Sequence, residues 1–397
     1  MTLDHYLQPL PLVAVLRGIT PAEIPAVAEA LYGEGFRILE VTLNSPQPFE
    51  SIRLLADGYG DKCLVGAGTV IDVADVARVK DAGGRLIVMQ FEEVAVGDPG
   101  PGQARVRHTA VGVNYIDTYH RGGLYPLPMP SGLGNEAAGV VEAVGSGVDW
   151  ISVGDRVGSC TGPLGAYSTA RVVPADRLVK LPDGVDDRTA AATMLKGLTV
   201  QYLLRQTVPL KGGETILFHA AAGGVGLIAC QWARALGVTM IGTVGSDEKA
   251  ALAREHGCTH TIVYTRENFV ERVKELTGGK GVPVVYDGIG KDTFPASLDC
   301  LAPRGMFVSY GNASGPVAAF NLGLLAQKGS LYATRPTLVT YAADQASLNA
   351  MASELFAMIK SGKIKADINQ TFALKDAAAA HRALQGRQTT GATLLLP

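Results

Sequence analysis

The feature that most constrains the fold of this chain is a glycine-rich turn between an apolar strand and a helix. Residues 215–218 are an apolar run, Gly223, Gly224 and Gly226 follow, and the next residues have helical spacing. A second apolar strand is expected at 238–244. The glycines let the backbone turn tightly and approach a pyrophosphate, which then lies at a helix N-terminus. This order of elements predicts a doubly wound, Rossmann-type parallel sheet that binds a dinucleotide.

The turn departs from the usual fingerprint because Ala220 stands where its first glycine is expected. An ordinary strand-to-helix turn is the alternative, but the complete strand–turn–helix–strand order favours a dinucleotide site. NAD sites usually end the second strand with Asp or Glu, whereas here Asp247 and Glu248 follow Ser246 and suit a helix start. Lys249 either meets a 2′-phosphate or is a solvated helix lysine. We favour NADP.

Composition excludes several other classes of function. The 397 residues are enough for two or three domains, and a net charge of −2 favours neither nucleic acid nor an anionic membrane as a partner. The first residues do not resemble a signal peptide, and the apolar stretches are too short or too interrupted to span a bilayer, so we expect a cytoplasmic protein. The scattered cysteines form no CxxC pair, and we expect small buried side chains at Cys63, Cys160, Cys230, Cys258 and Cys300.

Residues 1–89 read as alternating strands and helices of short period, which is typical of a (β/α) TIM barrel. The strands are expected at 12–17, 38–43, 64–70 and 86–89, and the helices at 21–33, 48–59 and 73–82. A complete barrel needs eight units, so this segment is a partial barrel. Arg17 and Glu40 interrupt apolar strands, and either face a polar centre or form a structural ion pair.

Three motifs of this segment resemble the 2-dehydro-3-deoxy-phosphogluconate and phosphogalactonate aldolases: LRGITP at 16–21, LEVTLNSP at 39–46 and VGAGTV at 65–70. The resemblance implies that Arg17 binds substrate and that Glu40 is the general acid/base. It ends near residue 89, before that family's Schiff-base lysine. Lys62 and Lys80 are expected in a loop and on a helix. Without an amine at the barrel centre no imine forms, so we do not expect aldolase activity.

From residue 90 the pattern changes to alternating strands with many glycines and prolines, which predicts a β-rich domain. Strands are expected at 91–96, 103–112, 138–144 and 156–159. Five motifs then resemble the zinc-free NADPH:quinone oxidoreductases, the zeta-crystallin-like branch of the medium-chain dehydrogenase/reductases. They are NYIDTYHRGGLY at 114–125, GLGNEAAG at 132–139, GDRV at 154–157, LKGLTV at 195–200 and HAAAGGVG at 219–226.

The resemblance implies a domain order for the whole chain. The partial aldolase-like barrel takes 1–89, a GroES-like catalytic domain takes 90–200 and 332–397, and the Rossmann domain takes 201–331. That family begins with a strand and turn that are absent here, so we interpret the chain as a fusion of two truncated modules. The half barrel would expose strand edges, and the family implies a homodimer built through the edge strand of the Rossmann sheet.

The resemblance also implies a reaction without metal. The zinc-dependent branch uses Cys and His ligands near the positions of Asn114 and Asn135, and an amide beside the lone carboxylate of Glu136 is a poor zinc site. We therefore expect no metal, and an acceptor that takes a hydride without a Lewis acid, namely a quinone or enone. The alternative is an NADPH-binding crystallin-like or regulatory protein with little turnover.

The family resemblance assigns roles to residues of both domains. Asn114, Tyr119 and Tyr125 would line the nicotinamide and substrate cleft, although Tyr125 also fits simple packing. A proton for the product would come from water or Tyr119. His219 is interpreted as structural. The expected NADPH contacts are Lys196, Thr199, Ala222, Gly223, Gly224, Val225, Gly226, Ser246, Lys249, Tyr264, Asn312, Ser314 and Arg387. Of these, Lys196 and Thr199 would lie near the nicotinamide ribose, and the 2′-phosphate would be held by Ser246, Lys249, Tyr264 and Arg387.

Overall fold

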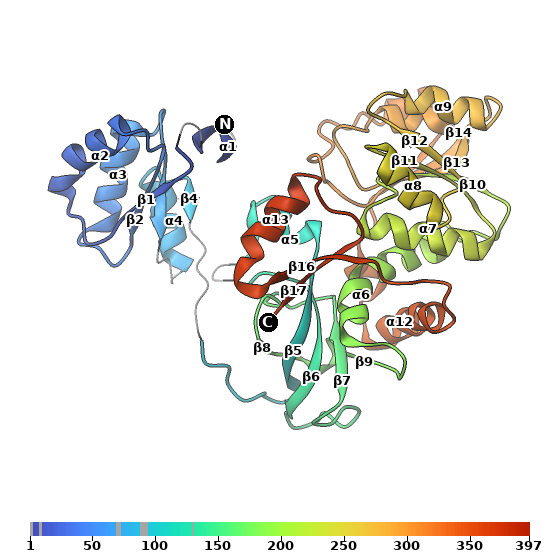
Figure 1. Cartoon of the computed structure of the whole chain (residues 1–397), viewed down its shortest axis with the longest axis horizontal. Helices are drawn as coiled ribbons and strands as arrows, with labels where there is room; N and C mark the ends of the chain where they lie inside the picture. The colour runs from blue at the N-terminus through green and yellow to red at the C-terminus, as the bar shows by residue number, and fades with distance from the viewer. Residues whose placement is uncertain (1–2, 8–9, 69–72, 88–93, 129–130) are drawn as a thin grey trace. The chain divides into compact units, whose positions relative to one another are not determined.

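The structure is a computed structural model that describes residues 3–7, 10–68, 73–87, 94–128 and 131–397. The chain forms two compact units (Figure 1). The first comprises Met1–Ala95 with Pro126–Ser131, and the second comprises Val96–Tyr125 with Gly132–Pro397. No helix in these described ranges is long and apolar enough to cross a bilayer.

The first unit is a four-stranded parallel sheet in the order β1-β2-β3-β4. Its strands are β1 (Val13–Leu16), β2 (Ile38–Thr42), β3 (Leu64–Gly68) and β4 (Leu86–Ile87). Its helices are α1 (Leu3–Tyr6), α2 (Ile24–Gly33), α3 (Pro48–Tyr59) and α4 (Val73–Asp81), and a short 3₁₀ turn (Pro21–Glu23) precedes α2. The neighbouring strand order is what successive βα units produce.

The core of this unit lies between the helices and one face of the sheet. Ile24 of α2 and Ile52 of α3 are buried with Leu39 and Val41 of β2. The predicted strands and helices are therefore present. The predicted strand ends at 69–70 and 88–89 lie outside the described residues, and a barrel arrangement stays a prediction.

Arg17 and Glu40 have different environments in the structure. Glu40 is buried, and its burial raises the pKa of its carboxyl, while the charge of Arg17 opposes that rise. Arg17 is exposed, and its guanidinium is not within 4.0 Å of the Glu40 carboxylate. The structural ion pair considered for these two residues is therefore not formed.

The segment between the aldolase-like and the reductase-like parts of the chain does not form the predicted strand. Of the strand expected at 91–96, residues 91–93 lie outside the described residues, and residues 94–96 are not in a strand. Residues 94–102 as a whole contain no helix or strand. Two prolines and three glycines in 97–102 explain this, because proline lacks a backbone donor and glycine costs conformational entropy.

The second unit contains a six-stranded sheet whose neighbouring strands are all parallel, in the order β12-β11-β10-β13-β14-β15. This is the 3-2-1-4-5-6 order of a Rossmann sheet. Its strands are β10 (Thr215–Phe218), β11 (Thr239–Val244), β12 (His260–Val263), β13 (Val282–Asp287), β14 (Leu301–Ser309) and β15 (Tyr332–Thr334). The helices connecting them are α7 (Gly224–Leu236), α8 (Asp247–Glu255), α9 (Phe269–Leu276) and α10 (Gly323–Gln327).

The same unit contains a second, mainly antiparallel sheet in the order β16-β17-β5-β6-β7-β9, with β8 paired to β5. Its strands are β5 (Gln103–Val113), β6 (Glu136–Val144), β7 (Arg156–Ser159), β8 (Ala170–Pro174), β9 (Val179–Lys180), β16 (Ile368–Ala373) and β17 (Ala392–Leu396). The C-terminal strands β16 and β17 thus complete a sheet begun almost 300 residues earlier. The accompanying helices are α5 (Tyr115–Arg121), α11 (Leu338–Tyr341), α12 (Gln345–Lys360) and α13 (Ala377–Gln385).

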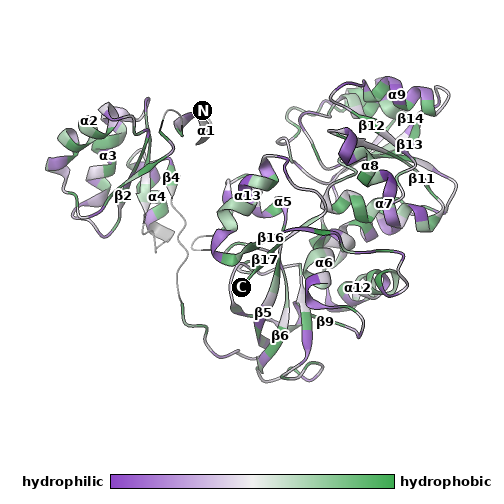
Figure 2. Ribbon diagram, viewed as in Figure 1, coloured by the Kyte–Doolittle hydropathy of each residue, from purple (hydrophilic) through white to green (hydrophobic). Residues whose placement is uncertain are grey.

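Helix α6 (Asp187–Tyr202) joins the two sheets into one core. It is buried on nearly every side, packs on β5, β6 and β17, and also contacts α7 of the parallel sheet. The fit is tight, because a Cβ at Gly197 would lie 2.6 Å from Leu355 of α12. Helices α7 and α9 carry hydrophilic as well as hydrophobic residues (Figure 2), as amphipathic helices on a sheet do.

Candidate active site

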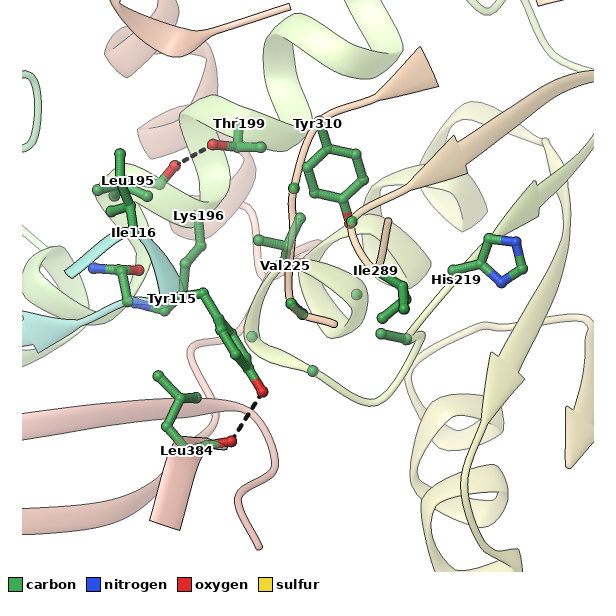
Figure 3. Close-up of a pocket in the computed structure, with 18 of the residues that line it drawn as sticks. Tyr115, Ile116, Leu195, Lys196, Thr199, His219, Val225, Ile289, Tyr310 and Leu384 are labelled. Atoms are coloured by element: carbon green, nitrogen blue, oxygen red, sulfur yellow. Dashed lines mark hydrogen bonds between the residues drawn. The ribbon is translucent and has the colours of Figure 1, made fainter. Parts of the chain in front are cut away.

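One large cavity of about 580 Å³ lies in the second unit. It is lined by the glycine turn after β10, by the end of β5 and the start of α5, and by α6. Residues at the ends of β11, β13 and β14, the segment that follows β15, and residues between 384 and 393 also line it (Figure 3). The cavity therefore lies at the carboxyl ends of the parallel strands, where open α/β sheets bind their ligands.

The glycine turn leaves room and donors for an anion. The amides of Gly224, Val225 and Gly226 begin α7. Within the described ranges the amides of Val225 and Gly226 have no backbone partner, whereas a parallel bridge between Gly223 and Gly391 brings the Gly391 carbonyl next to Gly224. Side chains are excluded here, because a Cβ at Gly226 would lie 2.3 Å from the Ala220 carbonyl oxygen. Ala220 itself adopts φ +57°, so it takes the left-handed conformation that glycine usually supplies. These amides and the positive end of α7 fit a pyrophosphate.

Three of the four predicted 2′-phosphate residues, Lys249, Tyr264 and Arg387, come together at one end of the cavity. Lys249 Nζ donates to the Arg387 carbonyl oxygen at 2.8 Å, although the two residues are 138 positions apart. Burial and the charge of Arg387 lower the pKa of Lys249. Lys249 is therefore not a freely solvated helix lysine. Arg387, Lys249 and Tyr264 all line the cavity, and two adjacent cations suit a phosphate dianion.

The opposite end of the cavity is organised by a buried carboxylate. Glu136 Oε2 accepts hydrogen bonds from Lys196 Nζ at 2.9 Å and Asn114 Nδ2 at 2.8 Å. Its Oε1 accepts from the Leu195 amide at 2.7 Å. The donors around Glu136 are thus an ammonium, an amide and a backbone N–H. No group of three or more His, Cys, Asp or Glu side chains suited to a metal occurs among the described residues.

Two tyrosines, both hydrogen-bonded to Asn312, form the wall beside this end. Tyr119 Oη accepts a hydrogen bond from the Asn312 backbone amide at 2.9 Å, and its ring meets the Tyr125 ring edge-on at 5.3 Å. The Asn312 side-chain oxygen accepts from Tyr125 Oη at 3.0 Å and from Arg335 Nη2 at 3.1 Å. Burial raises the pKa of Tyr119, so its hydroxyl stays protonated. That proton has no acceptor in the part of the chain described here.

Most of the sequence-predicted residues line the cavity, but three do not. Ser246 caps α8 by accepting a hydrogen bond from the Lys249 amide at 3.3 Å. Ser314 Oγ donates to the Ile289 carbonyl oxygen at 2.9 Å, and Asn312 lies behind the wall. Thr199 lines the cavity, yet its hydroxyl donates to the Leu195 carbonyl oxygen at 2.8 Å (Figure 3). The roles of all these residues toward a cofactor stay predictions.

His219 is a buried structural residue at the edge of the cavity. Its ring nitrogens lie 2.9 Å from Thr243 Oγ1 and 3.0 Å from Ser297 Oγ. Burial lowers its pKa, so the ring is neutral. In Figure 3 the ring points away from Tyr115 and Lys196.

The same chain can be compared with known proteins. Family models match at residues 100–183 (alcohol dehydrogenase GroES-like domain) and 224–344 (zinc-binding dehydrogenase). The quinone oxidoreductase of Pseudomonas aeruginosa is 63% identical over 311 residues, which cover 78% of this chain and 96% of that protein. The chain belongs to the quinone oxidoreductase family. The resemblance drawn from the five sequence motifs is therefore confirmed.

Two further relatives are informative about the cavity of this chain. The structure of Escherichia coli quinone oxidoreductase complexed with NADPH superposes with a TM-score of 0.76 at 53% identity, covering 77% of this chain and 95% of that one. The 2-haloacrylate reductase of a Burkholderia species is 52% identical over 77% of this chain and 94% of its own length. The N-terminal segment matches a different family model, KDPG and KHG aldolase, over residues 3–91.

Sequence reasoning missed two charged residues of the cavity: Asp292, which pairs with Arg387 at 3.4 Å, and Arg335. Its Nη1 donates to the Ser309 carbonyl oxygen at 2.8 Å and its Nη2 to Tyr125 Oη at 2.9 Å. No carboxylate of the described residues lies within ion-pair distance of it. Its position directly after β15, at the carboxyl edge of the sheet, was the available signal. The aromatic residues Tyr310 and Phe269 also line the cavity and were not predicted.

Proposed function

We propose that this chain is an NADPH-dependent reductase of quinones and related conjugated carbonyl compounds. The observation that carries the proposal is one continuous cavity with a phosphate-binding glycine turn, a cationic end and a tyrosine-walled end. Bound NADPH would supply a hydride from its nicotinamide ring. The relatives named quinone oxidoreductases, and the NADPH complex of one of them, support the same conclusion.

In this proposal each end of the cavity has a distinct task. The amides of 224–226 hold the pyrophosphate, and Lys249 with Arg387 hold the 2′-phosphate. Lys196, fixed by Glu136, lies near the ribose end. Tyr119 donates its free hydroxyl proton to the carbonyl oxygen of the acceptor, where negative charge develops. Tyr125 offers a flat face for an aromatic ring.

NADPH oxidation at 340 nm with 1,4-benzoquinone tests the proposal, run beside NADH and with a chelator present. Quinone-dependent oxidation that prefers NADPH and ignores the chelator is expected. Binding of NADPH, followed by its fluorescence, without turnover would instead identify the chain as an NADPH-binding protein of the crystallin-like or regulatory type.

Arg335 favours a second group of acceptors, the α,β-unsaturated carboxylates. Among the described residues it has no carboxylate partner, it lies at the tyrosine-walled end of the cavity, and a guanidinium pairs well with a planar carboxylate. One relative is a 2-haloacrylate reductase, whose substrate carries such a group. In the balanced reaction the substrate double bond takes a hydride and a proton, and NADPH leaves as NADP⁺. Assay of 2-chloroacrylate with wild type and Arg335→Gln tests this second function, which requires a loss of at least about tenfold in kcat/KM.

Three further statements belong to the same proposal. The chain is a fusion of an aldolase-like segment with a reductase, divided as the sequence analysis sets out except that β15 (Tyr332–Thr334) belongs to the parallel sheet and not to the GroES-like domain. The reductase forms a homodimer through the edge strand β15, which exposes Tyr332. The enzyme acts in the cytoplasm. Sedimentation of the full chain tests the dimer, and borohydride trapping with pyruvate tests for residual aldolase chemistry, which we expect to be absent.

A further inference from the structure

A chain of buried polar groups begins at Asp117 of helix α5. The Asp117 carboxylate accepts hydrogen bonds from the Asn114 amide at 2.8 Å, Asn135 Nδ2 at 3.1 Å and Tyr167 Oη at 3.0 Å. Tyr167 Oη also lies 2.8 Å from His381 Nε2. His381 Nδ1 in turn lies 3.0 Å from Arg121 Nη1.

The direction of every hydrogen bond in this chain follows from its last member. A guanidinium only donates, so His381 Nδ1 accepts from Arg121. The neutral His381 ring then carries its proton on Nε2 and donates to Tyr167 Oη. The Tyr167 hydroxyl proton is consequently directed at Asp117, which accepts it. Burial and the nearby charge of Arg121 lower the pKa of His381 to about 4, which keeps the ring neutral.

The chain both leaves and returns to the same helix. Asp117 and Arg121 are four positions apart on α5, one turn of the helix. Tyr167 comes from the segment before β8, and His381 comes from α13. The hydrogen bonds therefore close a loop that attaches α5 at two points to two other segments of the chain. Arg121 Nη2 adds a bond to Gln385 of α13 at 2.6 Å.

Tyr167 is itself held in a fixed place by the backbone around it. A Cβ at Gly134 would lie 2.2 Å from Tyr167 Cδ1, so the ring packs directly on that glycine. Gly134 adopts φ +90°, a conformation that glycine tolerates best. Gly134 belongs to the GLGNEAAG motif, so this motif determines where the Tyr167 ring packs as well as the position of Glu136.

We propose that this closed loop of hydrogen bonds fixes α5 for catalysis, with Tyr167 and His381 as positioning residues. Asn114 caps α5 and bonds Glu136, while Tyr119 projects from the same helix into the cavity. The loop thus couples the segment before β8 and α13, two parts outside the reacting centre, to two residues at it. The expected effect on catalysis rests on the proposed reductase function. The attachment of α5 by the hydrogen bonds does not depend on that function.

The test compares Tyr167→Phe with the matched control Tyr286→Phe in the full chain. Both variants remove one buried, hydrogen-bonded hydroxyl. Tyr286 lies on β13 of the parallel sheet, and its hydroxyl donates to the Leu203 carbonyl oxygen at 3.1 Å. Tyr167→Phe is expected to lower kcat for a quinone about tenfold, because small displacements of positioning groups are costly to rate. The dissociation constant for NADPH should change less than about twofold, since the glycine turn is untouched. Tyr286→Phe should leave both values nearly unchanged.

The pH profile adds a readout that loss of stability alone does not move. Burial raises the pKa of Asp117 to about 6, against the hydrogen bonds it accepts and the charge of Lys196. Tyr167, His381 and Arg121 from the loop, and Glu136 beside Tyr167, are the other ionisable groups around it. The acid limb of kcat/KM is expected near this pKa. Tyr167→Phe removes one donor to the carboxylate and should move the limb to higher pH.

Hydrogen exchange of residues 115–121 keeps the inference testable if quinones are not turned over. Faster exchange of this helix in Tyr167→Phe and His381→Leu, but not in Tyr286→Phe, supports the attachment of α5. Unchanged exchange overturns it, whatever the fate of the proposed function. Unchanged kcat and an unmoved acid limb in a quinone-active enzyme overturn the positioning role.

Discussion

The Lys196 ammonium lies 2.9 Å from the Glu136 carboxylate, and the side chains of both residues are almost completely buried. Glu136 starts β6 of the antiparallel sheet, while Lys196 belongs to α6, which also contacts the parallel-sheet side. The pair thus ties the tyrosine-walled end of the cavity to the helix that joins the two sheets. Removing one partner leaves an uncompensated buried charge.

Glu136→Gln is expected to lower the free energy of unfolding by about 3–5 kcal/mol for this reason. Denaturant unfolding of the full chain measures it. Asp155→Asn is the control, because Asp155 pairs with Lys180 at 2.8 Å at the surface and should cost no more than about 1 kcal/mol. Equal effects of the two substitutions would contradict the assignment of a buried ion pair.

Gly226→Ala is expected to weaken NADPH binding by at least about tenfold, because backbone atoms block any side chain at this position. A Cβ there would lie 2.3 Å from the Ala220 oxygen and 2.6 Å from the Ala221 carbonyl. Gly223→Ala is the matched control, since its Cβ would meet only the Ala220 oxygen, at 3.3 Å. Titration of NADPH fluorescence gives both constants. Similar dissociation constants for the two variants would show that the turn can accommodate a side chain at position 226.

Arg387→Gln is expected to reduce the preference for NADPH over NADH by about tenfold or more, because one of two cations at the 2′-phosphate end is lost. The ratio of the two dissociation constants is the measurement. Arg266→Gln serves as the control, because this exposed arginine pairs with Asp247 on α8 and does not line the cavity. A ratio unchanged in Arg387→Gln would mean that Lys249 alone recognises the phosphate.

Stability is expected to fall as the pH drops below about 6.5, because the buried histidines His108, His219 and His381 resist protonation. Burial, with the charges of Arg171 and Arg121 respectively, lowers the pKa of His108 and of His381 from 6.5 to about 4. The folded chain then binds fewer protons than the unfolded chain between these values, so each of these two histidines removes up to about 3 kcal/mol of stability as pH falls.

Asp117 has the opposite effect on the pH dependence of stability, over a lower pH range. Its pKa is raised from 3.8 to about 6, so the folded chain binds the extra proton and gains stability as pH falls from 6 toward 3.8. The three histidines outweigh one aspartate, and the net slope stays positive with pH. Unfolding curves at pH 7.5, 6 and 5 measure it. His108→Gln should flatten the slope, and an unchanged slope would exclude His108 as a source.

The sequence by itself determined the elements and the cofactor class. Strands, helices and the glycine turn are encoded by local periodicity and by backbone sterics, which is why the βα units of 12–87 and the strand–turn–helix at 215–236 were predicted within a few residues. The left-handed Ala220 shows the limit of this approach. The departure was visible in the sequence, but only the structure shows that an alanine adopts the glycine conformation there.

Only the tertiary structure decided which distant residues meet. Lys249 meets Arg387, Tyr125 meets Arg335, and Asp117 reaches His381 through Tyr167, because β16, β17 and α13 return to the sheet that β5 begins. It also placed the Ser246 and Ser314 hydroxyls in hydrogen bonds to backbone groups, and neither residue lines the cavity. Such contacts depend on strand order and on packing between segments more than a hundred residues apart. Local sequence patterns carry no information about either.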